Sequence, residues 1–135
     1  GYALHLDTTG ELVAVHNGYG LERELRGPVV DPGDHELELR ITCPGGDRWD
    51  LALAVDGAEV ASAEGFRLLM AMAPFQGIDV GIDRRSPVSW ELYQRHGNFP
   101  FSGQLHEVRY QPGEPAPDSP NNFLELLREW GRTFE

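Results

Sequence analysis

The residues best suited to chemistry lie in one stretch of the chain, between residues 79 and 99. Two adjacent arginines are followed there by three aromatic residues, in a segment whose composition indicates a long loop. Guanidinium groups bind sulfate through charge-assisted hydrogen bonds, and aromatic side chains in loops are more often exposed than those in strands. The sequence therefore offers a candidate site for a glycan or sulfated ligand, made of Arg84, Arg85, Trp90, Tyr93 and Phe99.

The same stretch carries the most plausible metal ligands. Asp79, Asp83 and Asn98 bracket the predicted loop, and carboxylate and amide oxygens are the ligands that calcium prefers. Asp79 can equally be a polar-face residue of a strand, and Asp83 can equally form a turn. Calcium is thus a candidate cofactor, and both interpretations stay open.

No catalytic residue is predicted within this chain. Cys43 is the only cysteine, so no internal disulfide forms, and there is no Gly-x-Ser-x-Gly motif for a nucleophilic serine. The five histidines are scattered, without the close spacing that a zinc site requires.

Charge excludes two classes of partner. The chain has 135 residues, enough for one domain, and a formal net charge of −11, with 22 acidic residues and 11 basic residues that are all arginine. Such a chain repels the phosphates of nucleic acid and the surface of an anionic membrane. The sequence contains neither a signal peptide nor a transmembrane run, which favours the cytoplasm without deciding the compartment. It begins at Gly1 in strand-like sequence without an initiator Met, so we expect a fragment of a longer polypeptide.

Alternating apolar and polar residues predict an antiparallel, all-β architecture. Asp7–Gly10, Asn17–Gly20 and Asp56-Gly57 are predicted turns, the last of type I′, and Gly27-Pro28 is assigned to a loop. The strands are expected over 2–6, 11–15, 21–25, 35–42, 49–55, 58–63, 66–72, 78–83 and 104–110. Gly81 is expected to mark a bulge or a close backbone approach.

The end of the chain has a different character. Residues 111–118 contain three prolines and are predicted to be a linker. Ser119-Pro120 then begins a predicted amphipathic helix over 119–135, with Phe123, Leu127 and Trp130 among its apolar residues. Its apolar face requires a partner, which is the rest of the domain, a neighbouring domain or a second copy in a homo-oligomer.

Several stretches of residues 1–110 together form a recognisable pattern. It includes Gly1–Leu6 and Val15–Arg23. Further on, it consists of Asp79, Val80, Gly81, Asp83, Ser86, Pro87, Val88, Ser89, Phe99, Phe101, Gly103, Leu105 and Val108. With these residues, the chain over 1–110 resembles the accessory β-sandwich that follows the catalytic domain in one branch of the arylsulfatase family. The resemblance implies a β-sandwich domain over 1–110, a jelly roll of about ten strands in the concanavalin/laminin-G style, in which calcium often binds at one rim.

The resemblance also implies a function without catalysis in this chain. Sulfatases of this family use a Cys/Ser-x-Pro-x-Arg motif, whereas Cys43 is followed directly by Pro44 and the next arginine is Arg48. The implied role is a non-catalytic accessory domain of an arylsulfatase-like sulfuric ester hydrolase, with the catalytic domain of the same polypeptide as its partner. The alternative is an independent carbohydrate-binding, lectin-like module that uses the aromatic loop.

Overall fold

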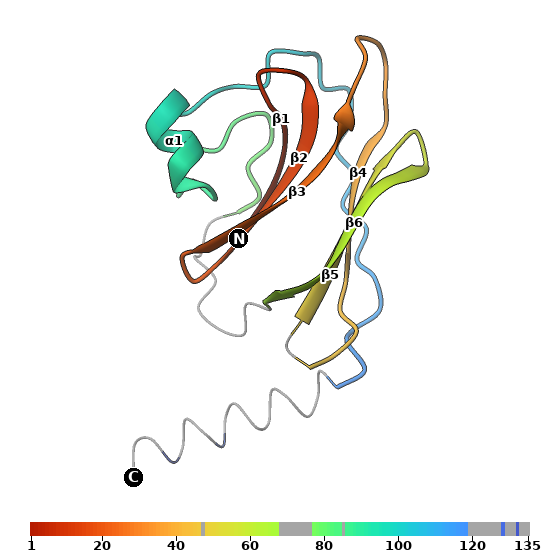
Figure 1. The fold of residues 1–135 in the computed structure, drawn as a ribbon, viewed down its shortest axis with the longest axis vertical. Helices are drawn as coiled ribbons and strands as arrows, with labels where there is room; N and C mark the ends of the chain where they lie inside the picture. The colour runs from red at the N-terminus through yellow and green to blue at the C-terminus, as the bar shows by residue number, and fades with distance from the viewer. Residues whose placement is uncertain (47, 68–76, 85, 119–127, 129–131, 133–135) are drawn as a thin grey trace.

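The computed structural model describes residues 1–46, 48–67, 77–84, 86–118, 128 and 132 (Figure 1). Within these residues the protein is mostly β, with two three-stranded antiparallel sheets and one short helix, which confirms the predicted all-β class. The first sheet has the order β1-β2-β3 and the second the order β4-β5-β6. The strands are β1 (Tyr2–Leu6), β2 (Glu11–Gly18), β3 (Leu21–Val29), β4 (Leu37–Thr42), β5 (Arg48–Val55) and β6 (Ala58–Arg67), and the helix is α1 (Trp90–His96).

Turn residues set the hairpins of both sheets. Asp56 and Gly57 have φ of 52° and 80°, so the predicted type I′ turn between β5 and β6 is confirmed. The turn between β2 and β3 is shorter than predicted, because only Tyr19 and Gly20 leave the ladder, with φ of 55° and 86°. The backbone N–H of Gly20 donates to the Asn17 side-chain oxygen at 2.9 Å, which fixes this tight turn.

The prediction of a loop at Gly27-Pro28 is wrong, because β3 continues to Val29. The pairing of β2 with β3 shifts register between Glu11 and Val13, and the irregularity takes up Gly27 and Pro28. Proline is tolerated there because β3 is an edge strand, where a missing N–H breaks no ladder bond. A Cβ on Gly27 would stand 3.4 Å from the Leu12 carbonyl oxygen and from a Leu53 methyl group, which is ordinary van der Waals contact.

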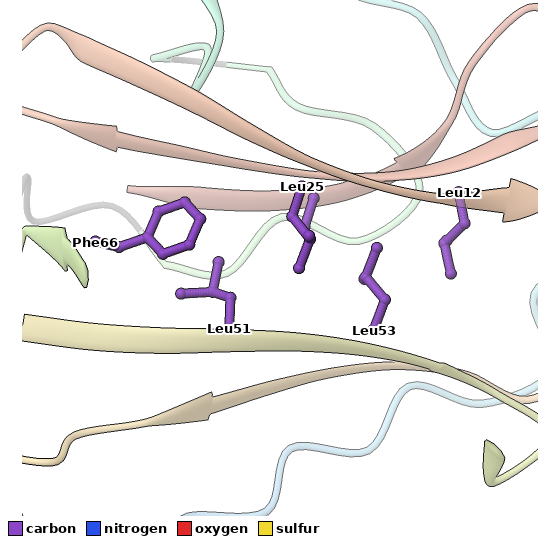
Figure 2. Close-up of a cluster of buried hydrophobic side chains, with 6 residues drawn as sticks. Leu12, Leu25, Leu51, Leu53 and Phe66 are labelled. Atoms are coloured by element: carbon purple, nitrogen blue, oxygen red, sulfur yellow. The ribbon is translucent and has the colours of Figure 1, made fainter. Parts of the chain in front are cut away.

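The hydrophobic core lies between the two sheets, which face each other (Figure 2). Alternate residues of each strand point into this layer, as a strand with one face on a core requires. The buried core residues are Leu12, Ala14 and Leu25 from the first sheet, and Leu51, Leu53 and Phe66 from the second.

Strand β2 is buried on both faces. Leu12 and Ala14 point toward the second sheet, whereas Val13 and Val15, which alternate with them, are also fully buried. Figure 1 shows α1 and the segment before it on the side of the first sheet that faces away from the second. The segment that carries the candidate site therefore covers the outer face of the first sheet.

The strand predicted over 78–83 is wrong apart from one antiparallel bridge, between Ile82 and Pro100. Gly81 has φ of 79°, which turns the chain and ends the extended run. The backbone N–H of Phe101 donates to the Gly81 carbonyl oxygen at 2.6 Å. The expected close backbone approach at Gly81 is thus confirmed, between two segments that form no sheet.

The strand predicted over 104–110 is also wrong, since these residues form no ladder and are exposed. Side-chain contacts hold the segment instead. A Leu105 methyl group lies 3.6 Å from where a Cβ of Gly81 would stand. Burial and, after it, the neighbouring Tyr110 raise the pKa of Tyr2, so these two side chains lie close together. The chain then descends beside β4, and Asp118 accepts a hydrogen bond of 2.8 Å from the backbone N–H of Gly46 (Figure 1).

Three other expectations concern element ends. The fourth strand begins at Leu37 rather than at residue 35, because the Asp56 carboxylate accepts hydrogen bonds from the His35 ring and the Glu36 N–H. Of the strand expected over 66–72, Phe66 and Arg67 end β6, and the rest lies outside the described residues. The helix expected over 119–135 lies outside them as well, apart from residues 128 and 132. Six strands are described, against about ten predicted.

Substituting Leu53 by alanine should lower the free energy of unfolding by about 2–5 kcal/mol, because Leu53 is fully buried between the sheets. Leu21→Ala is the matched control, since Leu21 is 66% exposed and should change stability by less than about 0.5 kcal/mol. Urea denaturation of both variants measures the difference. Equal losses in the two variants would contradict the assigned core.

Stability should also depend on His16, which is 2% exposed and lies edge-on to the rings of Trp49 and Phe66 at 5.5 and 5.6 Å. Its Nε2 has no hydrogen-bond partner among the described residues. Burial, together with the nearby amino terminus and Arg23, lowers the pKa of His16 from the usual 6.5. The His16 imidazole therefore binds a proton more readily in the unfolded chain than in the folded one. As a result, His16 does not reduce the free energy of unfolding above about pH 6.5, and it reduces that free energy progressively as the pH drops below this value.

Thermal unfolding between pH 5 and pH 7 tests this pH dependence. His16→Leu should flatten the rise of melting temperature with pH. His35→Gln is a control with the opposite pH dependence. The hydrogen bond to Asp56 raises the pKa of His35, so protonated His35 stabilises the folded state most at low pH. Its removal should make the rise steeper. An unchanged pH profile for His16→Leu would refute the role of the buried imidazole.

Candidate ligand-binding site

The candidate site is built around α1 (Trp90–His96), a helix that lies inside the predicted loop. Ser89 is its N-cap, and its hydroxyl oxygen accepts a hydrogen bond of 3.2 Å from the Leu92 N–H. Gly97 ends the helix with φ of 65°, and its N–H donates to the Tyr93 carbonyl oxygen at 2.8 Å. Both capping residues are visible in the sequence, but seven residues without an apolar stripe give no helical periodicity to detect.

The first sheet holds α1 through polar contacts at the start of the helix. The Glu22 carboxylate accepts hydrogen bonds from the Ser89 hydroxyl at 2.8 Å and from the Trp90 N–H at 3.0 Å. The Asn17 side-chain amide donates to the Val88 carbonyl oxygen at 2.8 Å. No residue of the helix itself is buried. These hydrogen bonds fix the start of α1 on the first sheet, and the partly buried Leu92 is its least exposed side chain.

Aromatic side chains follow one another along α1 and the loop after it. The rings of Trp90 and Tyr93 stack with centroids 5.2 Å apart and planes at 28°. Phe99 lies edge-on to His96 at 6.0 Å and to His5 of β1 at 6.3 Å. We call these five residues the aromatic row. The structure thus joins the three predicted aromatic residues to two histidines that the sequence did not indicate.

The sequence contained a signal for one of the two histidines, His96. Trp90, Tyr93 and His96 are spaced three residues apart, which places them on neighbouring positions of a helix surface once the helix is known. His5 lies far away in the sequence, and nothing in its local pattern points to the row. Burial lowers the pKa of the His5 imidazole, so the ring is neutral at pH 7 and contributes hydrogen-bonding nitrogen atoms without a charge.

The predicted arginines have different outcomes. Arg84 is exposed, and its backbone is tied on both sides of the loop. Its N–H donates to the Asp79 carboxylate at 2.9 Å, and its carbonyl oxygen accepts from the Asn98 amide at 3.4 Å. The backbone of Arg84 therefore lies beside Asn98, the residue that precedes Phe99. Arg85 lies outside the described residues.

The predicted calcium ligands have structural roles in the loop. Asp79 accepts from the Arg84 N–H, and Asp83 accepts from the Val88 N–H at 2.9 Å, so each carboxylate shapes its own turn. Across the described residues, no group of three or more His, Cys, Asp or Glu side chains gathers as a metal site. That observation does not test a set that includes Asn98, and calcium binding stays a prediction.

Cys43, the only thiol, lies away from the aromatic row in the loop after β4 and is half-buried. Burial raises the pKa of the Cys43 thiol, which lowers its thiolate fraction at neutral pH. This environment does not activate the cysteine as a nucleophile.

Comparisons of the chain with protein-family models, with curated proteins and with solved structures found no significant match. In the part of the chain that the structure describes, no helix is long and apolar enough to cross a membrane. Function is therefore inferred from the geometry described above and from the residues that carry the sequence resemblance.

Removing the Glu22 carboxylate should loosen α1 without unfolding the sheets. In Glu22→Ala, the Trp90 amide loses its acceptor, and we expect its hydrogen exchange to accelerate by about tenfold, as for the loss of a charged hydrogen bond. Glu24→Ala is the matched control, because Glu24 lies on the same strand as Glu22 and its carboxylate accepts a hydrogen bond from Arg26. Equal exchange rates at Trp90 in the two variants would contradict the proposed anchor.

Proposed function

We propose that this chain is a non-catalytic accessory domain of an arylsulfatase-like sulfuric ester hydrolase. In this proposal the two facing sheets belong to a β-sandwich of the concanavalin/laminin-G style. The domain packs on the catalytic domain of the same polypeptide and shapes access to the substrate. Catalysis is supplied from outside the chain, because Cys43 lacks the Pro and Arg spacing of the sulfatase motif.

The observation that carries the proposal is a set of exposed apolar side chains, which we call the apolar rim. It consists of Ile78, Val80, Phe101, Leu105 and Val108, which are between 39% and 70% exposed. The contacts of Gly81 with Phe101 and Leu105 bring the two parts of the rim together. Exposed apolar side chains that lie together, as Phe101 and Leu105 do around Gly81, are a common mark of protein–protein contact.

The position of the apolar rim supports contact with another domain of the same polypeptide. Val80, Phe101, Leu105 and Val108 are among the residues that carry the arylsulfatase resemblance. They lie in segments that form no strand ladder with the sheets. At this surface, backbone groups outside the sheets can form hydrogen bonds with a neighbouring domain, and the apolar side chains can pack against it, as in the core of a protein interface.

Hydrolysis of a chromogenic aryl sulfate tests the proposal directly. We expect activity from the open reading frame around this chain and none from the 135-residue chain alone. An upstream reading frame without a Cys/Ser-x-Pro-x-Arg motif, or activity in the short chain, would refute the accessory-domain function.

A paired substitution tests the apolar rim as the contact surface. Val80→Ser with Val108→Ser should leave the melting temperature of the isolated chain almost unchanged, because both residues are more than half exposed. In the longer polypeptide the same pair should lower the melting temperature and the sulfatase activity. Leu21→Ser, at a residue 66% exposed in the first sheet, is the control and should change neither. No effect of the pair in the longer polypeptide would remove the apolar rim from the interface.

A further inference from the structure

The three aromatic residues Trp90, Tyr93 and Phe99 of the aromatic row remain partly exposed and are not part of the hydrophobic core. Trp90 is 56% exposed, Tyr93 37% and Phe99 38%. The helix that carries Trp90 and Tyr93 is held by Glu22 and by the Ser89 cap, and none of its residues is buried. Aromatic side chains bring large apolar surfaces, and leaving a stacked pair in water forgoes the free energy of burying them. A ligand that covers these rings would recover that energy.

The surroundings of the row restrict the chemistry of that ligand. Between Trp90 and Phe99, apart from Gly97 and the partly buried Leu92, the residues outside the row are polar: Glu91, Gln94, Arg95 and Asn98. The apolar rim, by contrast, is mostly aliphatic. Nucleic-acid bases also stack on aromatic side chains, but their phosphates are repelled by a chain with a net charge of −11. A ligand with flat apolar faces, many hydroxyl groups and little negative charge fits best.

We infer that the aromatic row is a carbohydrate-binding platform, in which a pyranose ring stacks on the exposed face of Trp90 and the glycan extends toward Phe99. The Asn98 amide donates to the Arg84 carbonyl oxygen at 3.4 Å, so Asn98 and the backbone of Arg84 lie at the Phe99 end of the row. The side chains of both residues supply hydrogen bonds to hydroxyl groups, or to a sulfate where the sugar carries one. This inference goes beyond the proposed function and does not depend on it, since it needs no catalytic domain.

The row is organised before the ligand arrives. Stacking on Tyr93 restricts the Trp90 ring, and the Glu22 carboxylate fixes the backbone at Trp90. Phe99 is restricted in the same way between the rings of His96 and His5. Fewer rotamers are then lost on binding, which improves affinity for a ligand that makes few contacts.

Isothermal titration of the 135-residue chain with a neutral N-acetylglucosamine hexasaccharide and with its sulfated counterpart tests the inference. Trp90→Ala should weaken binding of both glycans by about tenfold, the loss expected for one stacking contact. Tyr19→Asn removes an exposed aromatic ring in the β2–β3 turn and should leave the affinity unchanged. Far-UV circular dichroism and melting temperature verify that both variants are folded.

The two glycans distinguish the sources of affinity. Equal binding supports stacking on a neutral sugar ring. Tighter binding of the sulfated form, with the difference abolished in Arg84→Gln, supports the same platform with a sulfate contact. Absence of binding to both glycans, or equal affinity of Trp90→Ala and the parent chain, would overturn the inference. A lower melting temperature of Trp90→Ala in the longer polypeptide, without glycan binding, would instead assign the row to a contact between domains.

Discussion

The burial of β2 on both faces is the constraint on which the rest of the structure depends. Leu12 and Ala14 require the second sheet, and Val13 and Val15 require a cover on the opposite side. Two layers satisfy the first requirement, because the leucines of β5 and Phe66 of β6 meet β2 across the core. The second requirement explains why a segment of irregular backbone lies over the outer face of the first sheet (Figure 1).

That cover is attached by polar contacts as well as by apolar ones. Asn17 of β2 donates to the backbone carbonyl before α1, and Glu22 of β3 accepts from the first N–H of the helix and from the Ser89 hydroxyl. The Ser89 hydroxyl oxygen also caps the helix. A carboxylate that accepts two hydrogen bonds fixes orientation more narrowly than apolar packing does. Because the attachment is made at the helix N-terminus, the outward side chains of α1 are not required for folding.

The elements that sequence reasoning predicted well are those whose local signals agree with their tertiary surroundings. Asp56-Gly57 specifies a type I′ turn, and the flanking alternation specifies β5 and β6, so this hairpin was predictable. Strands were also predicted over 78–83 and 104–110, but neither segment joins a sheet. The positive φ of Gly81 turns the first segment, and the second lies against the rest of the protein at Leu105 and Tyr110. Gly27-Pro28 signals a break in any isolated segment, and only the irregular pairing with β2 shows why the strand continues. Three aromatic residues of the site were predictable from type and spacing, whereas His5 and Glu22 reach it through the fold.

Apart from His5, the residues of the two surfaces come from one stretch of chain between residues 78 and 108, and the surfaces differ in chemistry. The apolar rim is mostly aliphatic and matches the interior of a protein interface, where water is excluded. The aromatic row is flat, flanked by polar groups and held in place by a carboxylate, which suits a hydroxylated ligand better than a second hydrophobic surface. Because Phe99 and Phe101 are two residues apart, a glycan on the row would lie beside whatever covers the rim. An accessory domain built this way would hold a sugar next to its catalytic neighbour, and the stacking surface would then influence which sugars reach the reaction centre.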